Sequence, residues 1–126
     1  MDVPADRKYR DTHEWHRLEG DVATIGITQF AADELTDITY VDLPEIGATV
    51  VTGESFGVVE SVKATSDLLS GVNGTIVAVN AELDEHPEWV NEDPFGKGWV
   101  VRVKISDPSQ LDALLSAEAY TKKIAG

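Results

Sequence analysis

Turn residues divide most of this chain into short runs that are rich in β-branched and aromatic side chains. Such side chains favour extended strands, and the residues between the runs favour tight turns. Residues 14–19 and 22–27 flank Gly20-Asp21, which predicts a β-hairpin. The chain is therefore predicted to be mainly β. Further strands are expected over residues 38–43, 50–51, 56–62, 75–80 and 99–105.

Helical spacing of apolar residues interrupts the strand pattern at two places. Residues 29–35 are expected to form a short helix with Thr28 as its N-cap. Near the C-terminus, Asp107 and the proline after it are typical of a helix start, and three leucines beyond them form an apolar stripe. A second helical segment is expected over residues 118–124. The sequence thus predicts a short internal helix and a C-terminal helix.

Residues 81–98 are dense in Asp, Glu, Pro, Gly and Asn, which predicts a long surface loop. Trp89 and Val90 are expected to fix this loop to the core. The chain has 126 residues and contains no linker, repeat or low-complexity tract that would divide it. We therefore expect one domain that spans residues 1–126.

Charge and composition exclude several classes of function. The chain has a formal net charge of −13, which argues against binding to nucleic acid or to anionic membrane surfaces. This charge suits basic protein partners, although it could equally serve only to keep the protein soluble. The chain has no cysteine, so any redox chemistry has to reside on an attached cofactor.

No run of residues approaches the ~20 apolar positions that a membrane helix needs. The acidic N-terminal residues also lack the pattern of a secretion signal or transit peptide. A cytoplasmic protein is expected, with a trimmed mature form as the alternative.

Lys63 is the only lysine or arginine between Leu18 and Gly96, a stretch that it shares with sixteen carboxylates. Small residues surround it, and β-type runs lie on both sides, which indicates the tip of a hairpin. A lysine at an exposed tip offers an accessible amine on a flexible stem, suitable for attaching a swinging group. The alternative is a surface lysine that only solubilises a turn.

The sequence around Lys63, Glu-Ser-Val-Lys-Ala-Thr-Ser-Asp at residues 60–67, resembles the lipoylation motif of the glycine cleavage H proteins. The resemblance covers nearly the whole chain. It departs from the family at residues 71–74, and Glu34 stands where the family commonly has His. The other matching blocks are residues 9–15 with His13-Glu14-Trp15, residues 22–28, 41–44 and 90–99, and Ala119-Tyr120.

The resemblance implies a flattened β-sandwich, or barrel-sandwich hybrid, of the lipoyl/biotinyl type. It implies lipoate in amide linkage to Lys63, which would supply the two sulfurs that this chain lacks. It also implies a non-enzymatic shuttle, with a bacterial cytoplasmic form favoured over a mature mitochondrial one. The implied partners are a pyridoxal-phosphate glycine decarboxylase (P protein), a tetrahydrofolate-dependent aminomethyltransferase (T protein), an FAD-containing dihydrolipoamide dehydrogenase (L protein), and a lipoate ligase or lipoyl/octanoyl transferase.

Two sets of residues around the arm are assigned by their place in the motif. Glu14 is expected to pair with the ammonium of the aminomethylated arm, while Thr12 and the chain around Asp67 close the pocket. Glu34 would add a second carboxylate. The expected recognition residues for the lipoylating enzyme are Glu60, Ser61 and Asp67.

Rival assignments fit the sequence less well. A biotin carrier usually flanks its lysine with methionines, and a lipoyl domain of a 2-oxo acid dehydrogenase lacks the His13-Glu14-Trp15 region. Donation of lipoyl or octanoyl groups to other carriers stays open, because the same lysine would serve. The sequence also disfavours an enzyme or a metal site. His13 and His16 would point to opposite faces of a strand, and residues 82–86 lack the spacing of a calcium loop.

Overall fold

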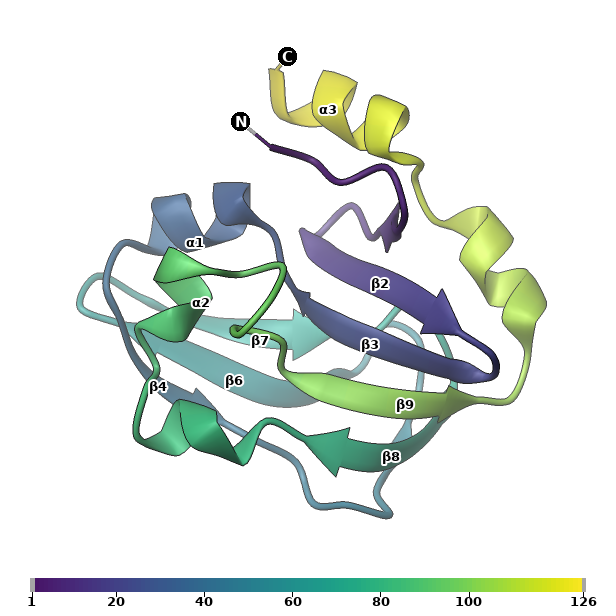
Figure 1. Cartoon of the computed structure of the whole chain (residues 1–126), viewed down its shortest axis with the longest axis horizontal. Helices are drawn as coiled ribbons and strands as arrows, with labels where there is room; N and C mark the ends of the chain where they lie inside the picture. The colour runs from purple at the N-terminus through teal and green to yellow at the C-terminus, as the bar shows by residue number, and fades with distance from the viewer. Residues whose placement is uncertain (1, 126) are drawn as a thin grey trace.

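A computed structural model describes residues 2–125 of the chain (Figure 1). Strands dominate the first two thirds, and helical segments cover one end and the C-terminus. The strands are β1 (Lys8–Tyr9), β2 (Glu14–Glu19), β3 (Val22–Ile27), β4 (Ile38–Asp42), β5 (Thr49–Val50), β6 (Ser55–Ser61), β7 (Thr65–Leu69), β8 (Gly74–Val79) and β9 (Val101–Ile105). The helical segments are α1 (Gln29–Leu35), the 3-10 helix η1 (Ala81–Asp84), α2 (Trp89–Glu92), the 3-10 helix η2 (Pro108–Ala113) and α3 (Ala117–Ala125).

The strands form two antiparallel sheets. The larger sheet has the order β1-β2-β3-β9-β8-β5, and the smaller has the order β4-β6-β7. The smaller sheet lies behind the larger one in Figure 1, and the two enclose the main core. This arrangement confirms the mainly β, sandwich-type fold expected from the sequence. The core side chains shared by the two sheets include Ile25, Val41, Val59, Leu68, Ile76 and Val103.

Local sequence signals predicted the first hairpin and the first helix correctly. β2 and β3 have the expected bounds, and Glu14 pairs with Ile27 at the open end of their ladder. α1 also has the expected bounds, and the Thr28 hydroxyl accepts a hydrogen bond from the Ala31 N–H (3.3 Å). The later strands that were given bounds lie within one or two residues of them, whereas β7 was expected only as a β-type run after Lys63, without bounds. The two-residue strand β1, paired with β2, was not expected.

The prediction of a long loop over residues 81–98 is wrong, because this segment contains η1 and α2. Leu83 and Val90 are buried in the core, so the chain has to bring apolar side chains inward at two points. Helical turns satisfy the backbone hydrogen bonds there. Asn80 then closes the segment by donating hydrogen bonds from its amide to the carbonyls of Lys97 (2.7 Å) and Trp99 (2.8 Å).

After Asp107, where the sequence predicted the start of a helix, the chain forms a 3-10 helix instead of an α-helix. Asp107 caps η2, a 3-10 helix, by accepting a hydrogen bond from the Ser109 N–H (3.0 Å). The expected helix near residues 118–124 is confirmed as α3. Tyr120 of α3 stacks on Tyr9 at a ring distance of 4.8 Å, which attaches the C-terminus to β1.

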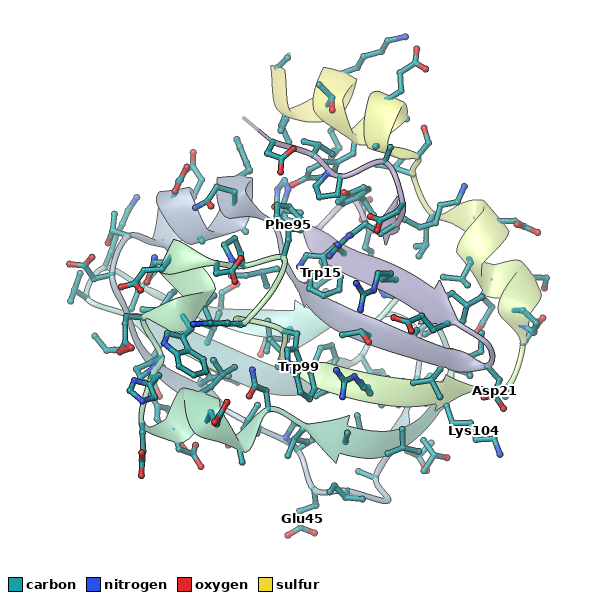
Figure 2. The ribbon with its side chains drawn as sticks, in the orientation of Figure 1. Trp15, Asp21, Glu45, Phe95, Trp99 and Lys104 are labelled. Atoms are coloured by element: carbon teal, nitrogen blue, oxygen red, sulfur yellow. The ribbon has the colours of Figure 1, made fainter. Side chains whose placement is uncertain are left out.

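A second, aromatic cluster forms on the outer side of the larger sheet. Trp15 is buried there, and its indole N–H donates to the Pro94 carbonyl (3.0 Å). Phe95 lies beside it, with ring centroids 6.1 Å apart (Figure 2). The Arg7 guanidinium lies 4.6 Å above the Trp15 ring. Gly26 pairs with Trp15 across the ladder, and the indole occupies the space that a Cβ would need.

Candidate functional site

Lys63 lies in the tight connection between β6 and β7, as the sequence predicted. Glu60 pairs with Thr65 in the last rung of the ladder, and β6 ends at Ser61, which leaves residues 62–64 between the two strands. The Ser61 hydroxyl accepts hydrogen bonds from the N–H groups of Lys63 (3.1 Å) and Ala64 (3.0 Å). The turn is therefore held rigidly, while the lysine side chain is exposed.

The Lys63 amine reaches across to α1. Its Nζ donates a hydrogen bond to the main-chain carbonyl of Glu34 (3.1 Å). This carbonyl belongs to the last turn of α1, where carbonyl groups lack helical partners and attract cations. Glu34 also lines a cavity of about 320 Å³, so the amine is hydrogen-bonded to one of the residues that form the cavity wall. The other lining residues are Thr12, His13, Phe30, Ala31, Leu35 and Ser66.

Glu14 lies behind the cavity wall and is only 2% exposed. Its carboxylate accepts a hydrogen bond from the Thr12 hydroxyl and another from the Leu69 N–H (3.0 Å). Arg10 in turn donates to the Thr12 hydroxyl oxygen (2.6 Å). Burial raises the pKa of the Glu14 carboxyl to about 7, although both hydrogen bonds favour the charged form. A carboxylate with this pKa would respond to a nearby cation at neutral pH.

Asp67 and Glu60, which were also expected near the arm or its attachment site, lie on the other face of the hairpin. Side chains alternate along a strand, so Ser66 and Asp67 of β7 point to opposite faces. Ser66 lines the cavity, whereas the exposed Asp67 accepts a weak hydrogen bond from the Ser55 hydroxyl (3.3 Å). Glu60 is also exposed. The cavity thus brings together Thr12, Glu34 and Ser66, and the alternation along β7 is the signal that would have identified Ser66.

The two N-terminal histidines have separate structural surroundings. His13 Nδ1 shares a hydrogen bond with the Tyr120 hydroxyl (2.7 Å), and His16 Nε2 accepts one from the Gly71 N–H (3.0 Å). Among residues 2–125, no group of three or more His, Cys, Asp or Glu side chains could hold a metal ion.

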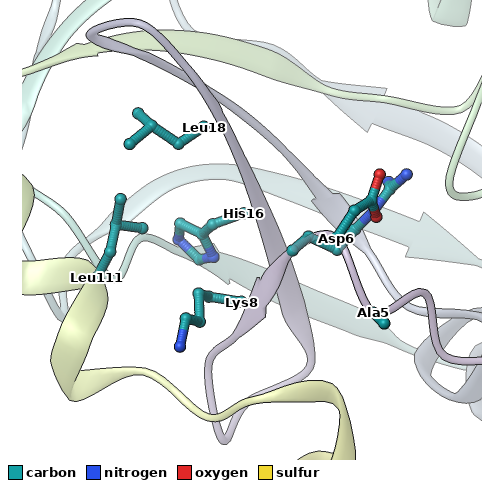
Figure 3. A pocket seen from close by; sticks show the side chains of 7 residues that line it. Ala5, Asp6, Lys8, His16, Leu18 and Leu111 are labelled. Atoms are coloured by element: carbon teal, nitrogen blue, oxygen red, sulfur yellow. The ribbon is translucent and has the colours of Figure 1, made fainter.

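A further cavity of about 330 Å³ lies between Lys8, His16 and Leu111 (Figure 3). Thr12, Glu14, Glu34 and Ser66 do not line this cavity.

A small two-sheet β fold that presents an exposed lysine at a hairpin tip, next to a helix that lines a cavity of about 320 Å³, defines a carrier protein of the lipoyl type. Comparison with known proteins gives the family. A model described as glycine cleavage H-protein matches residues 7–126. The chain belongs to this family.

Individual relatives agree over almost the full length. A glycine cleavage system H protein of Magnetococcus marinus is 55% identical over 121 residues, covering 96% of this chain and 86% of that protein. A probable glycine cleavage system H protein of Haloarcula marismortui is 52% identical and covers 98% of both chains. The crystal structure of a glycine cleavage system H protein from Mycobacterium marinum has a TM-score of 0.90 at 38% identity, covering 98% of this chain and 100% of that one.

Family membership establishes the role in outline. The protein is the lipoyl carrier of the glycine cleavage system, and it works with the P, T and L proteins as a non-catalytic shuttle. None of the helices in the described part of the chain is long and apolar enough to cross a membrane.

Proposed function

We propose that Lys63 carries lipoate in amide linkage and that the arm folds into the cavity lined by Thr12, Glu34 and Ser66. The observation that carries this proposal is the position of Nζ, 3.1 Å from the Glu34 carbonyl at the rim of that cavity. The neutral amine displaces the leaving group of an activated lipoyl group, so one amide bond forms and one proton is released. The amide N–H that remains can still donate to the Glu34 carbonyl.

The loaded arm then serves three enzymes in turn. The pyridoxal-phosphate decarboxylase transfers an aminomethyl group from glycine to the arm, and the tetrahydrofolate-dependent aminomethyltransferase removes it. The FAD-containing dehydrogenase reoxidises the dithiol. We assign these steps to the cytoplasm of a prokaryotic cell, since the relatives compared above are bacterial and archaeal. Tethering keeps the reactive group at a high effective concentration near each partner.

The attachment site is tested by intact-mass measurement and peptide mapping after incubation with lipoate ligase, lipoic acid and ATP. Lipoate is expected on Lys63 only. Lys63→Arg should abolish the modification and aminomethyl transfer, yet change the free energy of unfolding by less than about 0.5 kcal/mol, because Lys63 is exposed. Lys104→Arg, at another exposed lysine, is the matched control. Lipoate on a different lysine, or biotin on Lys63, would overturn the assignment.

We assign protection of the aminomethylated arm to two carboxylates. Glu34 at the cavity rim is accessible to the ammonium of the arm, and Glu14 is available behind Thr12 once that hydroxyl turns aside. A charge-assisted hydrogen bond contributes about 1.5–3 kcal/mol, enough to slow release without trapping the arm. Asp67 is exposed on the outer side of β7, so its part in closing the pocket would have to come through the backbone.

Protection is tested by the rate at which the aminomethylated protein releases ammonia without its transferase. Glu14→Ala should raise this rate, and Glu14→Ala/Glu34→Ala should raise it further. Glu54→Ala, at an exposed carboxylate before β6, serves as the control for charge. Release at the wild-type rate from both the single and the double variant would refute this role.

Glu60, Ser61 and Asp67 are also assigned to recognition by the lipoylating enzyme, since they flank Lys63 on a tip that offers few other features. Ser61 acts through the turn, because its hydroxyl holds the Lys63 and Ala64 N–H groups. Each alanine variant should slow lipoylation while the free energy of unfolding stays near that of the wild type. Unchanged lipoylation kinetics in all three would remove the assignment.

A further inference from the structure

Two of the exposed large apolar side chains lie on the β6–β7 hairpin that carries Lys63 or on the strand paired with it. Tyr40 of β4 is 46% exposed, and Val62 at the hairpin tip is 69% exposed. The others in the described part of the chain belong to different elements, namely Leu18 in β2, Val77 in β8, and Ile46 and Val51 in the loops beside β5. Exposed apolar surface in proteins often marks a contact site for a partner, and these two side chains are the ones nearest in strand pairing to the tip that carries Lys63.

A β-bulge directs Tyr40 outward. Ile38 and Tyr40 are two residues apart, and regular alternation would place both on the buried face. The ladder between β4 and β6 shifts register between these two residues, and as a result Ile38 is buried while Tyr40 is exposed. Bulges commonly redirect a side chain in this way. The exposure of Tyr40 therefore follows from a specific irregularity of the backbone rather than from a frayed edge.

The surface around these two side chains is acidic. Tyr40 pairs with Glu60 across the ladder, and Glu60 stands two residues before Val62. Farther along the same face, Asp42 and Asp67 lie on either side of Val58. We call the surface formed by Tyr40, Asp42, Glu60, Val62 and Asp67 the outer face. Its carboxylates are all exposed, and Lys63 is the only lysine or arginine in residues 18–96.

The outer face is joined rigidly to the Lys63 backbone but not to the cavity. The Ser61 hydroxyl holds the turn internally, and the main-chain bond from Val62 N–H to the Asp37 carbonyl (3.1 Å) ties the tip to the residue just before β4. Ser66 lines the cavity from the opposite face of β7. A protein bound to the outer face would thus hold the base of the arm in a defined place and leave the cavity uncovered.

We propose that the outer face is the docking surface for the enzyme that acylates Lys63, which contacts Tyr40 and Val62 through an apolar groove bordered by Lys or Arg side chains. This proposal rests on lipoylation of Lys63. The acylating enzyme has to position Nζ itself, whereas the P, T and L proteins act on the distal end of a flexible arm. A surface fixed relative to the base of the arm therefore favours the acylating enzyme, and opposite charge would steer its approach.

The test measures acyl transfer by purified lipoate ligase, with ATP and lipoic acid, to the apo forms of Tyr40→Ser and Val62→Ser. Each should raise the KM for the carrier about fivefold to tenfold, with little change in kcat, because less apolar area is buried on docking. Tyr40→Phe keeps the apolar ring and should behave as the wild type. Val77→Ser removes a similarly exposed side chain from β8 and is the matched control.

The outcomes distinguish failure of the proposed docking surface from failure of the proposed lipoylation of Lys63. A wild-type chain that accepts no lipoate would refute lipoylation itself. A wild-type chain lipoylated on Lys63, with KM unchanged in Tyr40→Ser and Val62→Ser, would refute only the docking surface. The fully lipoylated variants are then assayed with the P, T and L proteins. If the loss appears in those assays and not with the ligase, the outer face serves another enzyme and the proposal is overturned.

Discussion

Replacing Glu14 with Gln is expected to change how the free energy of unfolding depends on pH. Burial shifts the pKa values of two side chains of β2 in opposite directions, so their contributions to this dependence have opposite signs. Burial raises the pKa of the Glu14 carboxyl from 4.5 to about 7. Burial also lowers the pKa of the His16 imidazole from 6.5 to about 4. Folding therefore increases the proton affinity of Glu14 and decreases that of His16.

The sign of each effect follows from which state holds the proton. Between pH 5 and pH 7 the unfolded chain has lost the Glu14 proton while the folded protein retains much of it, so stability falls by about 2 kcal/mol as the pH rises. Over the same range the unfolded chain binds a proton at His16 that the folded protein does not bind. That difference disappears toward pH 7, so stability rises by about 2 kcal/mol. The two contributions nearly cancel in the wild type.

Urea unfolding monitored by tryptophan fluorescence at pH 5, 6 and 7 and constant ionic strength measures the effect. Glu14→Gln should become more stable relative to the wild type as the pH rises, by about 2 kcal/mol across this range. His16→Gln should show the opposite trend. Burial lowers the pKa of His13 as well, but this group is common to all three proteins and cancels in the differences.

Parallel curves for the wild type and Glu14→Gln would refute the reasoning. They would mean that the Glu14 carboxyl titrates alike in the folded and unfolded chains, and so that solvent reaches it freely. A constant loss of stability in Glu14→Gln, added to the pH-dependent difference, would report only the altered hydrogen bonds to Thr12 and Leu69. The pH dependence is therefore the readout that isolates burial of the charge.

Three further substitutions test the packing that supports the site. Gly26→Ala should lower the free energy of unfolding by about 1–3 kcal/mol in urea denaturation, because the new Cβ would lie 2.8 Å from Trp15 ring atoms. Asn91→Ala should cost about 1–3 kcal/mol, since it removes the partner of the Ile38 N–H (2.9 Å) and of the Thr36 carbonyl (2.7 Å), and hydrogen exchange at the Ile38 amide should accelerate. Thr36→Gly should raise stability by about 0.5–1 kcal/mol, because φ is +62° at this β-branched residue; a lower melting temperature would contradict this.

Local patterns in the sequence were sufficient for several parts of the fold. Alternation around Gly20-Asp21 predicted the hairpin with its correct bounds, and the cap at Thr28 predicted the start of α1. These elements depend on residues close in the chain, so propensity and turn chemistry decide them. The isolation of Lys63 and its surrounding motif likewise predicted a hairpin tip. Burial of Val90 was expected, but the helical turns within residues 81–98 escaped prediction because the composition there is typical of a loop and Leu83 is also buried in the core.

The environment of the site was decided by tertiary structure. The sequence shows Glu14 as one acidic residue near the start of a strand, but in the folded chain its carboxylate is buried and accepts a hydrogen bond from the Leu69 N–H, 55 residues away. Likewise, alternation separates Ser66 from Asp67, but only the packing of β7 against β6 and α1 decides which of the two faces the cavity. The cavity itself is bounded by the β1–β2 connection, α1 and β7, which are distant in sequence. Short-range signals determine which residues form a strand or turn, whereas the dielectric environment and neighbours of a side chain arise only when remote segments pack together.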